Sequence, residues 1–120
     1  MTDTKIDIYD EFEVSKLLMD LGVYPECKGY GYIITAMNLI KDDKSYLSSI
    51  TKKLYPGIAN IRNVKPSNVE RCIRTEVNRV INNNNELKHD IFGNELQNLT
   101  NFRFIACLYE YFRINKRIAL

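Results

Sequence analysis

Apolar residues recur at helical spacing along almost the whole chain. In each stripe they lie three or four positions apart, which places them on one face of an α-helix. No segment sustains the two-residue alternation of a half-buried strand. The pattern therefore predicts an all-α fold, a compact bundle of about six helices. The stripes are Val14, Leu17, Leu18 and Leu21; Tyr30, Ile33, Ile34, Met37 and Ile40; Leu47, Ile50 and Leu54; Val69, Cys72, Ile73, Val77, Val80 and Ile81; and Phe102, Ile105, Leu108, Tyr109 and Phe112.

Turn-forming residues mark the ends of several of these helices. Gly22 follows the first stripe, and Gly93 ends a short helical turn. Thr100 is a plausible N-cap for the last helix. The run of four asparagines at 82–85 should end the fourth helix, because asparagine favours turns over helix interiors. The third helix has to accommodate Pro56.

Residues 58–74 carry the pattern of a helix-turn-helix, two helices joined by a tight turn. Ala59 supplies the small residue at which the second helix crosses the first. Four positions later, Asn63 suits the left-handed backbone that the turn requires, and Val64 follows as an apolar plug. An ordinary helical hairpin is the alternative explanation of the same spacing.

The start of the second helix has two candidate signals. Pro66 fits the first helical position, where its missing N–H costs nothing. Ser67 and Glu70 have the spacing of a capping box one residue later. Both signals place the start at residues 65–67, so the candidate recognition helix covers about residues 66–81.

Charge is distributed unevenly along the chain, although 17 basic and 15 acidic residues leave a net charge of only +2. Residues 44–79 hold eight lysines and arginines against two glutamates, a local net charge of +6. Acidic residues gather at the start, and we divide the chain into an acidic lead-in, residues 1–13, and a helix-turn-helix domain, residues 14–120. A positive block this dense is a candidate phosphate-facing surface, with a solvated helix face as the plainer alternative.

The polar face of the 66–81 helix carries side chains of the types that read bases. Arg71 and Arg74 have the guanidinium fork that pairs with guanine, and asparagine amides pair with adenine. Glu70 can accept from cytosine or, alternatively, pair with Arg74 within the helix. The candidate base-contacting residues are Asn68, Glu70, Arg71, Arg74, Thr75 and Asn78. The candidate phosphate-contacting residues are Ser48, Ser49, Lys52, Lys53, Lys65, Ser67 and Arg79.

Several sequence blocks between about Val14 and Ile114 resemble the C-terminal effector domain of the sporulation response regulator Spo0A. The resemblance implies a six-helix fold whose fourth helix enters the major groove of a short DNA box, with pairs of domains on tandem boxes. It also implies that Glu70, Arg71 and Arg74 occupy the family's base-contacting positions. The blocks are Leu21-Gly22-Val23, Lys28-Gly29-Tyr30, Ser49-Ile50-Thr51-Lys52, Leu54-Tyr55-Pro56-x-Ile58-Ala59, Val69-Glu70-Arg71-x-Ile73-Arg74 and Thr100-Asn101-x-x-Phe104-Ile105-Ala106.

Two departures from this family affect the interpretation. The chain has Asn68 where the family usually has arginine, which removes one charge from the reading face. The family also carries an N-terminal receiver domain with a phosphoacceptor aspartate, and 120 residues leave no room for one. We interpret the chain as an isolated effector fragment or as a receiver-less relative. In the second case phosphorylation does not gate it in cis.

The sequence contains no constellation for catalysis, a cofactor or a metal, so an enzyme is not expected. Cys27, Cys72 and Cys107 are odd in number and widely spaced, which fits neither a disulfide framework nor a zinc site. His89 is the only histidine and lacks a partner at ligand spacing. The apolar stretches are too short to cross a bilayer, and the N-terminus lacks a signal peptide. These features predict a reduced, cytoplasmic, nucleoid-associated protein.

Double-stranded DNA is therefore the expected partner, with no membrane and no small-molecule substrate. Self-association through the aromatic 102–113 helix is a further candidate contact, and core packing of that helix is the alternative. The second candidate function is an interaction module that pairs with the full-length regulator or a sensor and antagonises it. In that case the acidic lead-in would cover the basic face.

Overall fold

The expected all-α bundle is confirmed. The computed structural model describes the backbone of residues 8–119 and the side chains of residues 8–116, and this range contains no strand. Its elements are α1 (Glu11–Asp20), α2 (Lys28–Asp42), the 3-10 helix η1 (Lys44–Ser48), the π-helical turn η2 (Ile50–Leu54), α3 (Tyr55–Arg62), α4 (Pro66–Asn82), α5 (Leu87–Phe92), the 3-10 turn η3 (Leu96–Asn98) and α6 (Asn101–Ala119).

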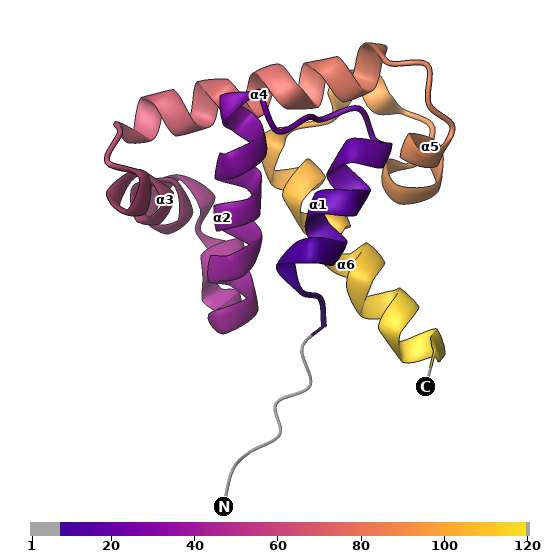
Figure 1. Ribbon diagram of the computed structural model, residues 1–120, viewed down its shortest axis with the longest axis horizontal. Helices are drawn as coiled ribbons and strands as arrows, with labels where there is room; N and C mark the ends of the chain where they lie inside the picture. Colours follow the sequence, from indigo (N-terminus) through magenta and orange to yellow (C-terminus); the bar gives the residue numbers. More distant parts are fainter. Residues whose placement is uncertain (1–7, 120) are drawn as a thin grey trace, which may run out of the picture.

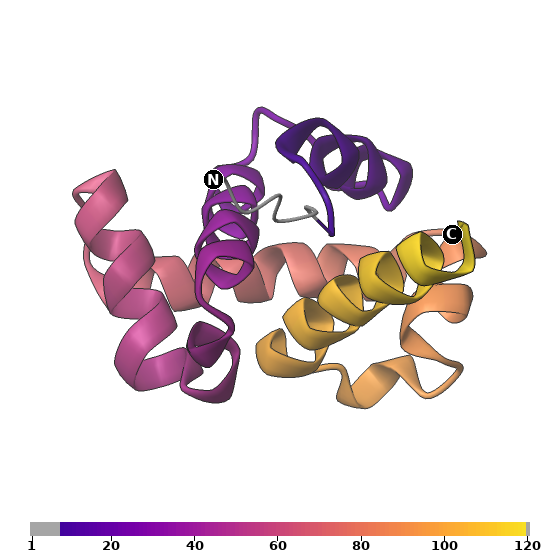
Figure 2. The ribbon, with the colours of Figure 1, turned by 90° about the horizontal axis from the view of Figure 1, so that it is seen from below.

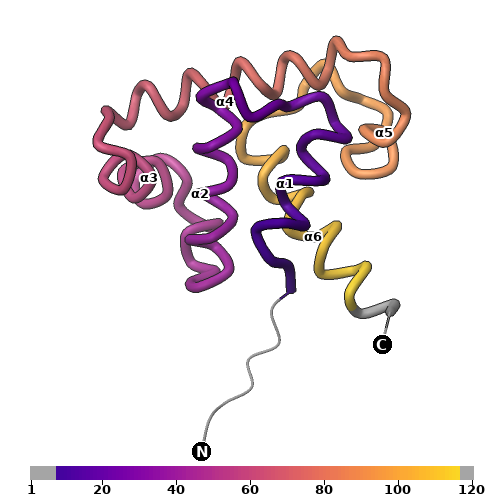
Figure 3. The backbone as a smooth tube through the Cα atoms, viewed as in Figure 1, coloured from indigo at the N-terminus to yellow at the C-terminus, as the bar shows by residue number. Residues whose placement is uncertain are grey.

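Helix α4 is the element around which the others are arranged. It runs across the top of Figure 1, with α3 beside its start, α2 descending from its middle and α5 near its end. The backbone trace in Figure 3 shows the tight turn that joins α3 to α4. The core lies under α4, where Ile33 and Met37 of α2, Ile73 of α4, and Phe104 and Ile105 of α6 are fully buried. One face of α4 is thereby fixed in the core while the other stays on the surface.

The packed fold also includes residues before the expected domain boundary at residue 14. Tyr9 is fully buried; its hydroxyl donates to the carbonyl oxygen of Met37 at 2.6 Å. Asp10 caps α1, because its carboxylate accepts from the Glu13 N–H at 2.8 Å while Glu13 accepts from the Asp10 N–H at 3.1 Å. These acidic residues therefore belong to the helix start rather than to a loose lead-in. Residues 1–7 of the expected lead-in lie outside the described range.

Gly22 ends α1 as predicted, in a backbone conformation with φ of 92° that glycine adopts without strain. The N–H of Gly22 donates to Met19 at 3.0 Å, and that of Val23 donates to Leu18 at 2.8 Å. This pair of bonds is a Schellman motif, which satisfies the last carbonyls of the helix.

The asparagine run ends α4 at Asn82, as its turn preference predicts. Its amides also have a role that the sequence did not indicate. The Asn83 amide donates to the carbonyl of Leu21 at 3.2 Å, and the Asn85 amide donates to that of Asp20. The run therefore attaches the end of α4 to the end of α1.

The single helix expected from Leu47 through Pro56 is replaced by η1, η2 and the start of α3. In η2 the N–H of Leu54 donates to Ser49 at 3.0 Å, five residues back, which is the π-helical pattern. Pro56 then falls in the first turn of α3, where helix N–H groups have no intrahelical partner. Proline is accommodated because the chain starts a new helix there instead of continuing an old one.

Candidate nucleic-acid interface

The turn between α3 and α4 has the geometry that the sequence predicted. Asn63 lies in the left-handed region, with φ of 57° and ψ of 49°, and is the only described residue other than glycine with a positive φ. The N–H of Val64 donates to the carbonyl of Ala59 at 3.0 Å, and Ala59 is buried. This bond closes the turn and turns the chain directly into α4.

Replacing Asn63 by alanine is expected to lower the free energy of unfolding by roughly 1–2 kcal/mol, because alanine tolerates the left-handed conformation less well than asparagine. The matched Asn63→Gly variant should keep the stability of the parent or exceed it, since glycine has no such penalty. Urea unfolding followed by circular dichroism measures both. Equal stability of the alanine variant and the parent would show that the turn is not held in this conformation.

Of the two candidate start signals, the structure uses Pro66. Lys65 is the N-cap and makes no side-chain capping bond, and Pro66 is the first residue of α4. The capping box of Ser67 and Glu70 is not formed, because Glu70 is engaged elsewhere. The observed helix, residues 66–82, agrees with the expected range of about 66–81.

The reading face of α4 is the set of predicted base-contacting residues, and the structure places it on the outside of the molecule. Arg71, Arg74, Thr75 and Asn78 are exposed, and Asn68 and Glu70 are partly exposed. Of the apolar stripe on the opposite side, Val69, Ile73, Val77 and Val80 are buried, and Cys72 and Ile81 are partly buried. The helical periodicity therefore separates core from surface as predicted, and the face is open to a partner.

Side chains of the reading face pair with one another in this structure. The Arg71 guanidinium donates to the Asn68 amide oxygen at 2.9 Å. Arg74 and Glu70 form an ion pair at 3.3 Å, which is the intrahelical alternative for Glu70 that the spacing left open. Exposed pairs of this kind contribute about 0–1 kcal/mol, so exchanging them for contacts with a partner costs little.

A groove of about 480 Å³ runs along one side of the reading face. Glu70, Arg74 and Asn78, each one turn apart, form its α4 wall. The opposite wall comes from Thr51 of η2 and from the start of α6, including Phe102. The predicted base contacts thus open onto a groove that the sequence did not reveal.

The predicted phosphate contacts divide into two groups in space. Lys52, Lys65, Ser48 and Ser67 are exposed, and Ser49 is partly exposed. Arg79 lies on the other side of α4, next to the start of α2, and pairs with the buried carboxylate of Glu76 at 3.0 Å. The structure therefore does not bring Arg79 together with the lysines of η2.

Lys53 is held by the turn before η2. Its ammonium donates to Asp43 at 3.1 Å and to the Ser45 hydroxyl, and it lies 4.6 Å from the centre of the Tyr46 ring. Hydrogen bonds from Ser45, together with Lys53, lower the pKa of Asp43 to about 2. The carboxylate is therefore charged at neutral pH and competes with any phosphate for Lys53.

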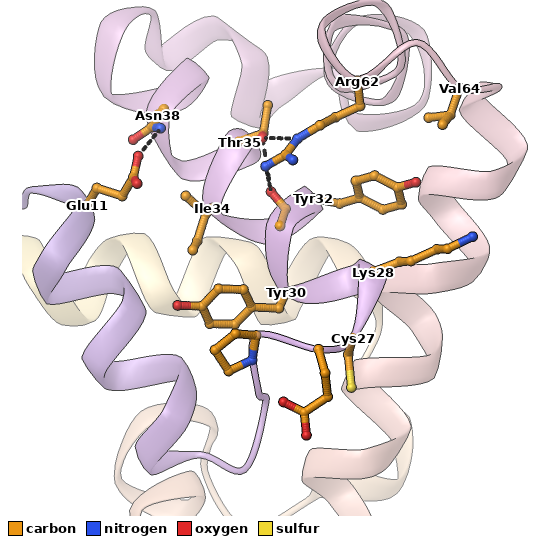
Figure 4. Close-up of a pocket in the computed structure, with 13 residues that line it drawn as sticks. Glu11, Cys27, Lys28, Tyr30, Tyr32, Ile34, Thr35, Asn38, Arg62 and Val64 are labelled. Carbon is orange, nitrogen blue, oxygen red and sulfur yellow. Dashed lines mark hydrogen bonds between the residues drawn. The ribbon is translucent and has the colours of Figure 1, made fainter.

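Arg62, one of the basic residues of the 44–79 block, is used within the fold. Its Nε donates to the Thr35 hydroxyl and its Nη2 to the carbonyl of Gly31, both at 2.9 Å. Figure 4 shows this clamp above Tyr32, in the wall of a hollow of about 640 Å³. The clamp joins the end of α3 to α2, so it positions the helix-turn-helix although the Arg62 side chain is exposed.

Asn101, which sequence reasoning gave no role, ties α6 to both helices of the turn. Its buried amide donates to the Tyr55 hydroxyl at 3.0 Å and to the carbonyl of Glu70 at 3.1 Å. Burial raises the pKa of Tyr55, so the phenol stays protonated. The preceding Thr100 accepts from the Arg103 N–H at 3.1 Å and caps α6 as predicted. The sequence signal for Asn101 was only its place beside a capping threonine.

Most apolar side chains of the 102–113 helix pack into the core of the same chain. Phe104, Ile105, Leu108, Tyr109 and Phe112 are buried. Core packing therefore accounts for this stripe, and self-association through it stays a prediction.

Two helices joined by a left-handed turn, with the second presenting an exposed polar and basic face, define a helix-turn-helix domain. A family model for the C-terminal part of the sporulation initiation factor Spo0A matches residues 14–112. The chain therefore belongs to the Spo0A C-terminal domain family, a family of DNA-binding regulatory domains and not of enzymes. The resemblance found in the sequence blocks is confirmed.

The described part of the chain contains neither a membrane-spanning helix nor a metal-binding cluster. Among residues 8–119, no helix combines the length and the apolar character needed to cross a membrane. Over the same residues, no cluster of three or more histidine, cysteine or acidic side chains is placed to hold a metal ion.

Proposed function

We propose that this chain is a sequence-specific DNA-binding transcription regulator of the sporulation or stationary-phase type, acting on DNA in the cytoplasm. The observation that carries the proposal is the exposed face of α4 directly after the helix-turn-helix turn. That face presents Arg71 and Arg74 from a helix whose other side is anchored in the core. A rigidly held helix of this kind fits the major groove, which admits one α-helix.

The residues of the face have distinct roles in this proposal. Arg71 and Arg74 exchange their intramolecular partners for guanine edges, and Glu70, released from Arg74, accepts from cytosine. Asn68 and Asn78 are placed to pair with adenine, and Thr75 offers its methyl and hydroxyl groups. With Asn68 in place of an arginine, we expect the preferred box to differ at one position from that of family members that carry arginine.

Phosphate contacts set the register of α4 along the groove. The exposed lysines and serines around η1, η2 and the start of α4 flank the reading face and suit this role. Lys53 contributes when phosphate replaces Asp43 as its partner. The remaining positions in the proposed set are Ser48, Ser49, Lys52, Lys65, Ser67 and Arg79.

The test is selection of preferred sites from random duplex DNA, followed by mobility shifts on the selected box at two salt concentrations. Regulation by direct DNA reading predicts one recurring box and a shift that weakens as salt rises. The chain should be compared with a form that lacks residues 1–7, which precede the buried Tyr9. No shift with either form would contradict the proposal and favour the interaction module that antagonises a full-length regulator.

Replacing Lys53 by alanine is expected to weaken binding to the selected box and to random duplex by the same factor. Because one phosphate contact is lost, the slope of log affinity against log salt should become shallower by about 0.9. Lys52→Ala should behave in the same way, without the competition from Asp43. Fluorescence anisotropy over a salt series measures both.

The matched control is Lys16→Ala on α1, which also removes a lysine paired with an aspartate, at 3.7 Å. Lys16 lies away from the helix-turn-helix, so its loss should leave the salt slope unchanged. A change in the preferred box caused by Lys53→Ala would contradict a pure phosphate role.

A further inference from the structure

Phe102 is a large apolar side chain that the fold leaves half exposed, at 50%. It lies in the first turn of α6, between the buried Asn101 and the buried Phe104. Phe102 lies at the edge of the buried stripe of α6, one turn before Ile105, and half of its side chain stays outside the core. Its position on the surface therefore calls for an explanation other than core packing.

The ring stands at the meeting point of two surface hollows. One is the groove of about 480 Å³ whose α4 wall contains Arg74 and Asn78. The other, of about 500 Å³, is lined by Phe102 together with Lys44, Ser45, Leu47 and Ser48 of η1. Figure 2 shows the start of α6 next to η1, alongside α4. The Phe102 ring therefore lies between Arg74 and Asn78 of the reading face on one side and Ser48 on the other.

The backbone that carries Phe102 is fixed on both sides. Before it, Asn101 is bonded to Tyr55 of α3 and to the backbone of Glu70 in α4. After it, the N–H of Arg103 is capped by Thr100. The backbone at residue 102 therefore has a fixed position relative to the reading face, so binding does not have to order it.

Apolar groups are scarce on the surface that a duplex presents in its major groove. The 5-methyl group of thymine is the one that apolar side chains recognise there. A phenyl ring beside Arg74 cannot donate hydrogen bonds to the bases or phosphates, but it can pack against such a methyl group. Within the reading face only Thr75 carries a methyl group, and Phe102 adds a second, larger apolar contact beside Arg74.

We propose that Phe102 packs against the 5-methyl group of a thymine at the edge of the DNA box bound by α4. This rests on the proposed function, since it requires α4 in the major groove. The contact makes Phe102 a specificity-determining residue on α6, outside the recognition helix. The domain then reads its box from two helices, with polar contacts from α4 and an apolar contact from α6.

The experiment replaces the thymines of the selected box one at a time by deoxyuridine, which removes only the methyl group. Parent chain and Phe102→Ala are titrated against each duplex by fluorescence anisotropy. The parent should lose about fourfold in affinity at one edge position, the value of one buried methyl group. Phe102→Ala should bind the full box at least that much more weakly and show no further loss at that position.

The matched control is Phe12→Ala on α1, which also removes an exposed phenylalanine ring, one that is 75% exposed. It should bind every duplex as the parent does. Circular dichroism melting of both variants checks that the fold is kept, which we expect because both rings are exposed.

Several results would overturn the assignment. The assignment is wrong if the parent selects a box but loses no affinity at any deoxyuridine position. It is also wrong if Phe102→Ala keeps the methyl sensitivity of the parent. A loss confined to duplexes with two boxes would instead assign the ring to a contact between copies. Each of these leaves the proposed function intact, whereas a parent chain that selects no box overturns both.

Discussion

Arg74→Ala should weaken binding to the selected box by roughly 1–3 kcal/mol, or about 5- to 150-fold. The loss comes from the two parallel hydrogen bonds that the guanidinium makes with one guanine in the proposed complex. In the uncomplexed chain Arg74 only forms an exposed pair with Glu70, so the substitution should leave the fold intact. Selection with the variant should give a box with relaxed preference at that one base.

Two controls separate base reading from charge. Arg113→Ala on α6 also removes an exposed arginine that pairs with a glutamate on its own helix, Glu110 at 2.6 Å, and should leave DNA affinity nearly unchanged. Arg74→Lys keeps the charge but loses the planar fork, so it should recover the salt dependence without recovering specificity. If Arg74→Ala binds the box as tightly as the parent, α4 does not read it through this residue.

Gly29→Ala should lower the free energy of unfolding by about 1–3 kcal/mol and weaken DNA binding with it. A Cβ atom on Gly29 would lie 2.6 Å from the carbonyl oxygen of Cys72 and would also meet the buried Glu76 side chain. This carbonyl is part of the α4 backbone, so it cannot avoid the clash by changing a side-chain rotamer. Relief therefore requires α2 and α4 to separate, which moves the recognition helix relative to α3.

Gly31→Ala is the matched control on the same helix. There the nearest atom is Nη2 of Arg62 at 3.0 Å, at the end of a flexible side chain that has to shift by only a few tenths of an ångström and can keep its bonds to Thr35 and Gly31. Alanine also gains about 0.5–1 kcal/mol over glycine inside a helix, so the net change should be small or favourable. Guanidinium unfolding curves and binding titrations of the two variants measure the difference. Equal effects at Gly29 and Gly31 would contradict a specific close approach between α2 and α4.

The parts of the fold that could be predicted are those set by neighbouring residues. The Asn63 turn, the start at Pro66 and the Thr100 cap each follow from the conformational chemistry of one or two residues. The η2 turn was missed because its hydrogen bonds compete with those of an α-helix over only five residues. The packed start of the fold was missed because an acidic run signals solvent, whereas the burial of Tyr9 depends on α2 and α6.

The candidate site likewise has a part that the sequence predicted and a part that it did not. Helical periodicity was enough to place Arg71, Arg74 and their neighbours on one exposed face, because that follows from spacing alone. Spacing says nothing about contacts between distant segments. The Arg62 clamp and the Asn101 anchor join residues 27 or more positions apart in the sequence. Only the folded chain therefore shows that Arg62 ties α3 to α2 and that the Asn101 amide ties α6 to α3 and α4.

The asparagine tract that ends α4 is not a neutral spacer that can change length freely. Its second and fourth members hold the last carbonyls of α1, while its first and third members, Asn82 and Asn84, are exposed. Tolerance to substitution should therefore alternate along four identical residues. Because the four residues are identical, an added asparagine would keep both amides in place and move α5 by one residue, whereas a lost one would put glutamate at the fourth position. In this protein two tertiary hydrogen bonds give individual positions of a low-complexity stretch a structural role.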